Sequence, residues 1–188
     1  MKLIILDRDG VINHDSDDYI KSVAEWRPIN GSIDAIARLY RAGYHICVAT
    51  NQSGLRRGYF DDVVLSNIHN TMERLVTNAG GHLDKIVWCP HLPDDNCNCR
   101  KPLPGLVDTI IQSYAGREIE ECWMIGDSLR DLQAGHARGC KLILVKTGKG
   151  SRTLNDSKGE PLLELAHICN DLSDATDMIL EQPSSLSS

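Results

Sequence analysis

The stretch that best indicates the fold reads Lys2-Leu3-Ile4-Ile5-Leu6-Asp7-Arg8-Asp9-Gly10. A short apolar run that ends abruptly in polar residues is typical of a buried strand. Two aspartates follow the run at positions i and i+2, and Gly10 permits unusual backbone angles just behind them. Carboxylates brought this close repel each other unless a cation holds them or one is protonated. The stretch therefore predicts a buried strand that ends in a cation-binding turn.

Similar apolar runs alternate with helical patterns along the 188 residues. We expect strands at residues 2–6, 44–49, 85–88, 122–125, 141–145 and 167–169. We expect helices near residues 31–42, 61–79, 104–114, 129–138, 162–166 and 173–180. This alternation predicts a Rossmann-like α/β fold, with a mainly parallel sheet and helices on both faces. The length suits a single domain over residues 1–182, and we expect the Ser-rich residues 183–188 to form a flexible tail.

The composition argues against several classes of protein. Hydrophobic residues make up 41% of the chain and charged residues 24%, which is ordinary for a globular protein. No apolar run reaches the roughly 18 residues of a membrane span, and the apolar start is too short for the core of a signal peptide. A net charge of −6 argues against a nucleic-acid or membrane-surface partner. Seven cysteines, an odd number, argue against a disulfide framework.

Polar side chains also follow two further predicted strands. Thr50 comes directly after the second strand, where its hydroxyl and the next backbone N–H groups could bind phosphate oxygens. Asp127 follows the fourth strand, and Asp131 lies one helical turn later. Because ligands of such sheets bind outside the carboxyl ends of the strands, these groups should converge with Asp7 and Asp9. Each alone is more often a cap or a strand-end residue, but together they predict a Mg²⁺ site, since Mg²⁺ prefers hard oxygen ligands.

Three of the seven cysteines crowd together with a histidine. The segments Cys89-Pro90-His91 and Cys97-Asn98-Cys99 could supply three thiolates and one imidazole, a ligand set that suits tetrahedral Zn²⁺. All four ligands would come from the protein, so the zinc would be structural rather than catalytic. It would order the polar loop 89–99, which leads directly into Arg100 and Lys101. Redox chemistry or unrelated thiols are the alternative interpretation of this cluster.

Four short motifs, in this order, resemble those of the haloacid dehalogenase superfamily of phosphatases. They are Leu6-Asp7-Arg8-Asp9-Gly10, Thr50-Asn51-Gln52, Lys101-Pro102 and Gly126-Asp127. The resemblance implies that Asp7 is the nucleophile that forms an aspartyl-phosphate. It implies that Asp9 is the general acid for the leaving alcohol and then the base for water. It also implies that the phosphoryl group is held by Thr50 and Lys101.

The same resemblance implies the ligands of a catalytic Mg²⁺. Asp7 and Asp127 would bind the metal through their side chains. A further ligand would come from Asp9, through its side chain or its backbone, or from the carbonyl of Arg8. Asp131 is a weaker candidate that would act through metal-bound water. The metal would offset the crowding of anions around the transferred phosphoryl group.

Two groups of this superfamily combine a short cap with a Cys/His loop: the heptose bisphosphate 7-phosphatases and the histidinol-phosphate phosphatases. Residues 52–60 and 101–105 are similar to segments of the heptose group, whereas the histidinol group usually has Asp where Ser53 stands. Several heptose phosphatases carry Lys in place of Ser128, a departure that the nearby Arg130 could compensate. Likeness to the heptose group implies substrate contacts by Asp15, Tyr19, Asn51, Gln52, Ser53, Arg57 and Arg100.

This likeness implies Mg²⁺-dependent removal of the C7 phosphate from D-glycero-D-manno-heptose 1,7-bisphosphate. The reaction belongs to the cytoplasmic synthesis of nucleotide-activated heptose for lipopolysaccharide. We therefore expect a monomeric cytoplasmic enzyme without a large cap, whose partner is a small phosphorylated sugar. Two alternatives stay open: a histidinol-phosphate phosphatase with the same chemistry, and a non-catalytic, zinc-stabilised binding module.

Overall fold

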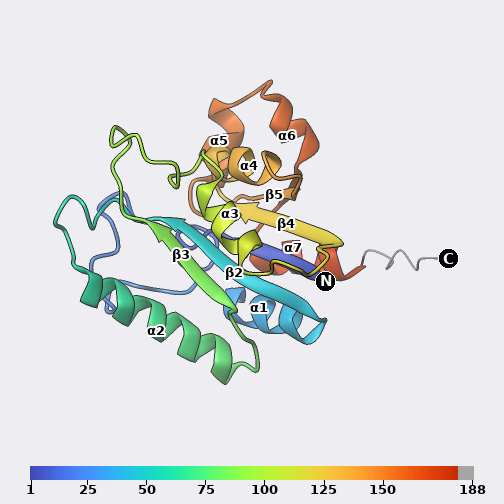
Figure 1. Cartoon of the computed structure of the whole chain (residues 1–188), viewed down its shortest axis with the longest axis horizontal. Coiled ribbons are helices and arrows are strands. Elements are labelled where there is room, and N and C mark those ends of the chain that lie inside the picture. Colours follow the sequence, from blue (N-terminus) through green and yellow to red (C-terminus); the bar gives the residue numbers. More distant parts are fainter. Residues whose placement is uncertain (182–188) are drawn as a thin grey trace.

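A six-stranded sheet runs through the middle of the computed structural model, which describes residues 1–181 (Figure 1). Its strands are β1 (Lys2–Leu6), β2 (Tyr44–Asn51), β3 (Lys85–Cys89), β4 (Glu121–Gly126), β5 (Lys141–Val145) and β6 (His167–Cys169). Every neighbouring pair is parallel, and the spatial order is β3-β2-β1-β4-β5-β6. The predicted parallel sheet is thus confirmed, and all six predicted strands lie within it.

β1 occupies the centre of the sheet because its side chains are apolar toward both faces. Leu3 to Leu6 are fully buried, and β1 pairs with β2 on one side and with β4 on the other. The chain builds β2 and β3 outward from β1 before it crosses back to start β4. The strand order therefore reverses between β1 and β4, and in such sheets the crevice at this switch point is where ligands bind.

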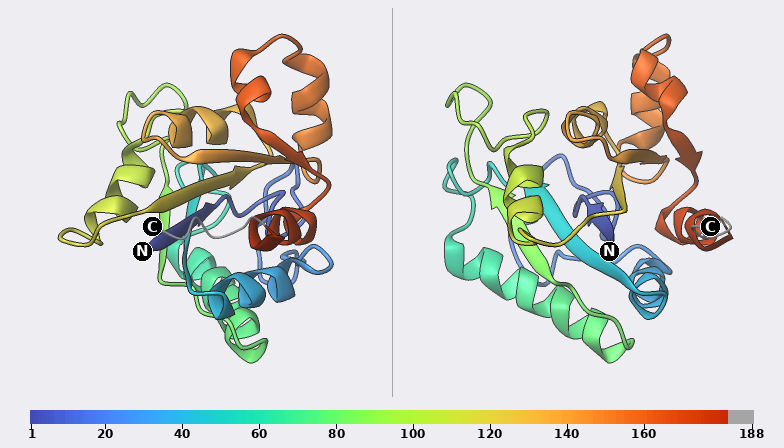
Figure 2. Two further views of the ribbon diagram at one scale, coloured as in Figure 1. Left: turned by 90° about the vertical axis from the view of Figure 1, so that its right-hand side faces the viewer. Right: turned by 45° about the vertical axis from the view of Figure 1, so that its right-hand side comes forward.

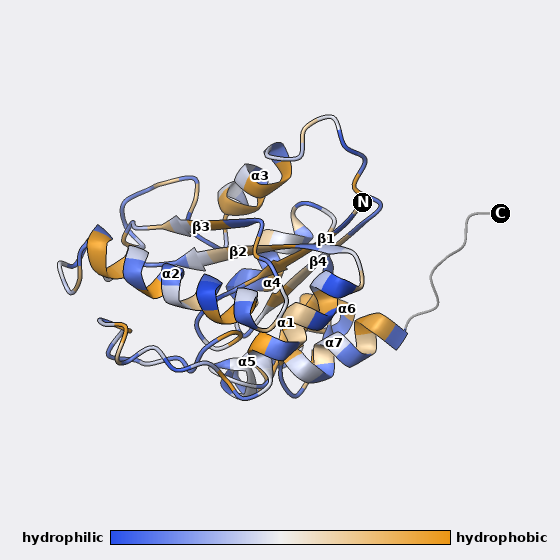
Figure 3. Cartoon of the chain, turned by 90° about the horizontal axis from the view of Figure 1, so that it is seen from below, coloured by the Kyte–Doolittle hydropathy of each residue, from blue (hydrophilic) through white to orange (hydrophobic). Residues whose placement is uncertain are grey.

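Two layers of helices cover the sheet (Figure 2). One layer consists of α1 (Ser32–Arg41), α2 (Asp62–Asn78) and α7 (Leu172–Glu181). The other consists of α3 (Gly105–Gln112), α4 (Leu129–His136), α5 (Gly150–Asp156) and α6 (Pro161–Leu165). Alternate residues of β1 serve the two cores, since Ile4 packs with the first layer and Ile5 with the second. Figure 3 shows the apolar central strands between helices whose surfaces mix apolar and polar residues.

Individual residues account for several helix ends. The side chain of Asp61 accepts a hydrogen bond from the backbone N–H of Val64 at 2.9 Å and caps α2. Gly43 has a φ of 87° just after α1, a conformation that glycine adopts without the steric cost of a Cβ. Helix α5 is an addition to the prediction, because its sequence, GSRTLND, has no helical apolar period.

A long loop follows β1. Residues 7–31 connect β1 to α1 and bury Ile12, Ile20 and Trp26 in the first core, so this segment is packed although it is mostly irregular. Within residues 1–181, the strands belong to this sheet and the helices to its two layers. No helix within residues 1–181 is long and apolar enough to span a bilayer. The predicted tail, residues 183–188, lies outside the described residues.

Candidate active site

Three carboxylates and one lysine meet at the carboxyl edge of the sheet. Asp7 follows β1 and Asp127 follows β4, while Asp131 comes from the first turn of α4. One oxygen from each carboxylate lies within 4.8 Å of the others. Nζ of Lys101 lies 2.9 Å from Asp7 and 2.6 Å from Asp131. The sequence makes Asp131 a weaker candidate than the other acids, yet the structure places it in the same group and in contact with Lys101.

Burial makes it unfavourable for all of these carboxyl groups to be ionised at once. Burial and the neighbouring Asp131 and Asp9 carboxylates raise the pKa of Asp7 to about 6, although Lys101 acts in the opposite direction. Burial, Asp131 and Asp7 raise the pKa of Asp127 to about 8. These carboxylates resist ionising together, so a divalent cation among them would remove a large repulsion. The donor set consists of hard oxygens, which fits Mg²⁺.

The carboxylate of Asp127 is enclosed by backbone. Gly10, at a φ of 86°, and Gly148 both pack so closely against Oδ2 that a Cβ at either position would collide with it. The backbone N–H of Lys149 donates to the same oxygen at 2.7 Å. Two glycines from segments far apart in the sequence therefore hold one acid at the edge of the sheet.

Asp9 has separate surroundings. Its Oδ1 accepts from Nε of Arg8 at 3.1 Å and from Nδ2 of Asn13 at 2.8 Å. Its Oδ2 accepts from Nη2 of Arg8 at 2.9 Å and from Nε2 of Gln52 at 2.8 Å. Burial would raise the pKa of Asp9, but Arg8 and the other donors lower it below its usual value. The structure thus separates Asp9 from the three-carboxylate group.

The carbonyl of Arg8 turns toward its own loop. It accepts hydrogen bonds from the backbone N–H groups of Ile12 at 2.8 Å and Asn13 at 3.2 Å. This use makes the Arg8 carbonyl a poorer candidate for a metal ligand than the adjacent carbonyl of Asp9. The side-chain oxygens of Asp9 are likewise occupied by nitrogen donors.

The end of β2 is hydrogen-bonded to the loop that carries Lys101. The side-chain amide of Asn51 donates to the carbonyl of Lys101 at 3.0 Å and accepts from its N–H at 3.1 Å. Nζ of Lys101 also donates to the carbonyl of Ala49 at 2.7 Å. With Asp7 and Asp131, this carbonyl uses all three donor positions of the ammonium group. Asn51, predicted as a substrate contact, therefore has a clear part in placing Lys101.

These groups line a cleft of about 210 Å³. Its walls include Asp7, Asp9, Thr50, Lys101, Asp127 and Asp131. Of the predicted substrate contacts, the cleft brings in Asp15, Tyr19, Asn51, Gln52, Ser53 and Arg100. Arg57 is exposed and is not among the described residues that line the cleft.

Lys149 also lines the cleft. The sequence allows two interpretations of this residue, a member of a positive patch near the strand ends or a solvated surface charge. Its Nζ lies 2.9 Å from Asp15 and 3.7 Å from Asp17, so it ties the β5–α5 connection to the loop after β1. Its position soon after the fifth strand was the available signal, since strand ends supply the ligand-binding edge.

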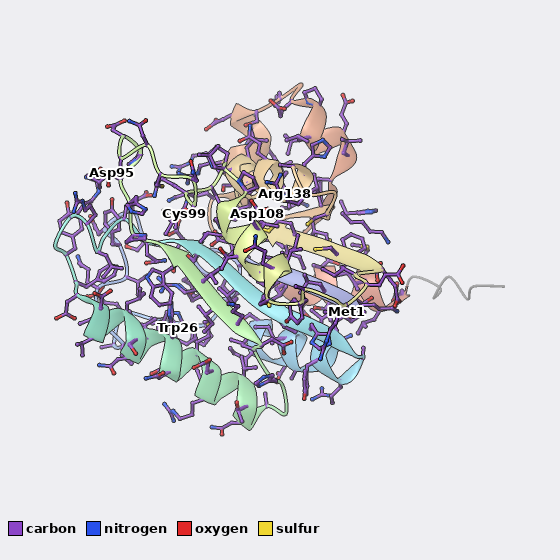
Figure 4. All side chains as sticks on the ribbon, viewed as in Figure 1. Met1, Trp26, Asp95, Cys99, Asp108 and Arg138 are labelled. Atoms are coloured by element: carbon purple, nitrogen blue, oxygen red, sulfur yellow. The ribbon has the colours of Figure 1, made fainter. Side chains whose placement is uncertain are left out.

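The predicted zinc ligands also come together. The ligand atoms of Cys89, His91, Cys97 and Cys99 lie within 4.8 Å of one another, and four of the distances between them run from 3.3 to 3.7 Å. A tetrahedron around Zn²⁺ with ordinary bond lengths has edges of about 3.3 to 3.8 Å. Figure 4 shows Cys99 near the base of the loop between β3 and α3 and Asp95 near its tip. The arrangement suits a closed metal site.

The chain is similar in sequence to known phosphatases. Residues 98–175 match the family described as "HAD-hyrolase-like". A protein of Pseudomonas aeruginosa, D-glycero-beta-D-manno-heptose-1,7-bisphosphate 7-phosphatase, is 52% identical over 95% of this chain and 98% of its own. The protein of the same name from Neisseria meningitidis serogroup B is 52% identical over 97% and 96%. This chain belongs to the heptose-1,7-bisphosphate 7-phosphatase family.

A solved structure of this heptose bisphosphatase family agrees with the assignment. The D,D-heptose 1,7-bisphosphate phosphatase from Bordetella bronchiseptica, complexed with magnesium and phosphate, is 48% identical and has a TM-score of 0.91. The alignment covers 97% of this chain and all of that one. The resemblance to haloacid dehalogenase phosphatases is therefore confirmed, and the chain is a phosphatase of this family.

The raised carboxyl pKa values predict how Mg²⁺ changes stability with pH. Without metal, folded Asp127 keeps its proton up to a pH of about 8, whereas the unfolded chain loses it near pH 3.8. This contribution to stability is present at low pH and is lost as the pH rises toward 8. Mg²⁺ binds the ionised carboxylates, so it should raise Tm more at about pH 8 than at about pH 5. Thermal melts with and without MgCl₂ measure the difference.

Two variants separate this effect from general salt stabilisation. Asp127→Asn should lose the Mg²⁺-dependent gain at both pH values, whereas Asp156→Asn, exposed on α5, should keep it. Equal gains at both pH values in the parent protein would contradict the link between the metal and these carboxylates.

Proposed function

We propose that this chain hydrolyses the C7 phosphate of D-glycero-D-manno-heptose 1,7-bisphosphate through an aspartyl-phosphate. The observation that carries the proposal is the pairing of Asp7 with Lys101 inside the carboxylate cluster, with Asp9 held separately beside the same cleft. Lys101 thus holds Asp7 in place, whereas Asp9 is held by its own hydrogen-bond partners. Two acids with different environments can take two roles in one reaction.

In the first step, an oxygen of Asp7 attacks the phosphorus and the bond from phosphorus to the C7 oxygen breaks. Asp9 gives a proton to the leaving oxygen, so the product leaves as an alcohol. In the second step, Asp9 takes a proton from water, and the water oxygen attacks the phosphorus of the aspartyl-phosphate. The bond from phosphorus to the Asp7 oxygen breaks, so inorganic phosphate leaves and the Asp7 carboxylate is regenerated. The Thr50 hydroxyl would donate to a phosphoryl oxygen, because it lines the cleft beside Asp7. Lys101 would hold a second phosphoryl oxygen by exchanging its hydrogen bond to Asp7 for one to the incoming group.

Mg²⁺ would be held by the side chains of Asp7 and Asp127 and by the backbone carbonyl of Asp9. When bound, it would neutralise part of the charge that gathers on the phosphoryl group. Asp131 suits a supporting role, because its oxygens already accept from Lys101 and from the N–H and hydroxyl of Ser128. Ser128 thereby completes a capping box with Asp131 at the start of α4.

We also propose structural Zn²⁺ at Cys89, His91, Cys97 and Cys99. The distances among the four ligand atoms support it, and four protein ligands leave no position for substrate or water. Nη1 of Arg100 donates to the carbonyl of His91 at 3.0 Å, which ties the zinc loop to the cleft wall. The metal would order the loop that delivers Lys101.

The heptose substrate is supported by the family and by the rim of the cleft. Asp15, Tyr19, Ser53 and Arg100 are polar groups at the rim that could contact sugar hydroxyls. Arg130 also lines the cleft, so a cation is present near the position where several relatives were expected to carry Lys instead of Ser128. The proposal includes a monomeric, cytoplasmic enzyme in the synthesis of nucleotide-activated heptose, with no nucleic-acid or membrane partner.

The substrate assignment predicts a clear order of turnover. Heptose 1,7-bisphosphate, in at least one C1 anomer, should have a kcat/KM about 100-fold or more above that of histidinol phosphate, because polar rim groups left unpaired penalise the wrong ester. Phosphate release from both anomers and from histidinol phosphate measures it. Faster turnover of histidinol phosphate would favour the alternative phosphatase, and no release from any ester would favour a binding module.

Asp7→Asn tests covalent catalysis. The amide nearly matches the carboxylate in shape but is a far weaker nucleophile, so turnover should fall by about 10⁴-fold or more. Circular dichroism should show an unchanged fold. Asp156→Asn, remote from the cleft, serves as the control and should keep full activity. Substantial activity in folded Asp7→Asn would refute the nucleophile assignment.

The zinc proposal predicts about one zinc per chain by elemental analysis of protein purified without added metal. Cys97→Ser should lower the zinc content and kcat/KM together, because Lys101 loses its ordered loop. Asp94→Asn changes an exposed residue of the same loop and should alter neither quantity. Folded, fully active protein that contains no zinc would contradict the assignment.

A further inference from the structure

A histidine lies buried behind Asp9, outside the groups that the proposed reaction uses. His69 comes from α2, and only 6% of its surface is exposed. Its Nε2 lies 3.3 Å from Nη1 of Arg8. The ring also contacts Trp88 of β3, with 5.4 Å between the ring centroids. The histidine is thus fixed from two sides, by the strand that α2 covers and by an arginine of the catalytic loop.

The partner of His69 is itself fully buried. Arg8 has no exposed surface, and its guanidinium contacts both oxygens of Asp9 in a two-point pairing. A guanidinium has donors only, so the hydrogen bond with His69 requires the lone pair of Nε2. The imidazole must therefore be neutral, with its proton on Nδ1. Burial and the charge of Arg8 lower the pKa of His69 to about 3, which agrees with a neutral ring.

When Asp9 is protonated, it depends more strongly on a fixed Arg8. As a carboxylate, Asp9 accepts from Arg8 twice, from Asn13 and from Gln52, which uses its four lone-pair positions. A protonated oxygen has one acceptor position fewer, so one donor must withdraw. Gln52 donates to Oδ2 and lines the cleft, whereas Arg8 approaches from the buried side. Once Gln52 withdraws, the hydrogen bonds from Arg8 must keep the carboxyl group of Asp9 in its orientation toward the cleft.

We propose that His69 is a positioning residue that locks the guanidinium of Arg8 and so aims the carboxyl group of Asp9 at the leaving oxygen of the phosphate ester. This inference rests on the proposed phosphatase function and on the acid role of Asp9. The competing interpretation is a buried histidine that only satisfies Arg8 and contributes to stability.

The nature of the leaving group distinguishes the two interpretations. A sugar alkoxide is a poor leaving group and needs the proton of Asp9 as the bond from phosphorus to oxygen breaks. A p-nitrophenolate leaves readily without a proton. A misaimed Asp9 should therefore slow the sugar phosphate selectively, whereas general damage to the site should slow both esters alike. The comparison uses kcat/KM, which reports the steps up to the first phosphoryl transfer.

The key variants are His69→Leu, which has no acceptor, and His69→Gln, whose amide oxygen can replace Nε2. His69→Leu should lower kcat/KM for heptose bisphosphate by about tenfold or more, since Asn13 still holds Asp9 and general acids contribute about 10² to 10⁴. The loss should be in kcat with little change in KM. The kcat/KM for p-nitrophenyl phosphate should fall by no more than about threefold. His69→Gln should recover most of the loss, and His136→Leu, an exposed site on α4, should behave as the parent protein.

Leaving the guanidinium short of an acceptor costs stability, so folding is checked by circular dichroism and Tm. If His69→Leu does not fold, His69→Asn takes its place, because its shorter amide stays polar but does not reach Arg8. An equal loss on both esters, no loss, or no recovery with His69→Gln would overturn the positioning role. If the parent protein hydrolyses other alkyl phosphates but not heptose bisphosphate, the proposed substrate fails, while the same ratio measured on those esters still decides the role of His69. A parent protein without any phosphatase activity would overturn both proposals.

Discussion

The buried ammonium group of Lys101 makes it possible for Asp7 and Asp131 to lie close together at the edge of the sheet. Nζ of Lys101 has oxygen partners in all three donor directions, from Asp7, Asp131 and the carbonyl of Ala49. Two poorly solvated carboxylates facing each other without that charge would carry a large desolvation and repulsion cost. Asp7, the start of α4 and the end of β2 therefore depend on the same cation for their positions.

Lys101 lies in a loop, so its position depends on whatever orders that loop. Asn51 holds the Lys101 backbone from both sides, and the Cys/His cluster ends at Cys99, two residues before it. Gly105, at the start of α3, packs against the backbone of Asn98 so closely that a side chain there would collide with it. The cation thus receives from three neighbouring contacts the rigidity that a helix or strand would otherwise give it.

The strands and the meeting of Asp7 with Asp127 could be predicted because they follow from local patterns and topology. Buried parallel strands such as Lys2–Leu6 leave uninterrupted apolar runs, and their ends share one edge. The partners of Asp9 could not be predicted in this way. Arg8 has the sequence context of an ordinary loop arginine, and only the packing of α2 against β3 buries it beside His69. Helix α5 was missed for a related reason, since tertiary contacts rather than an apolar period hold it.

The two glycines around Asp127 also bear on how such a protein can change over evolutionary time. Other residues of the loops that contain Gly10 and Gly148, such as Asp15 and Lys149, have side chains that line the cleft. Neither glycine can acquire a side chain while Asp127 keeps its place. A side chain added at either glycine would therefore displace an acid of the buried cluster, whereas a change at a lining residue such as Asp15 alters the cleft wall and leaves that acid in place.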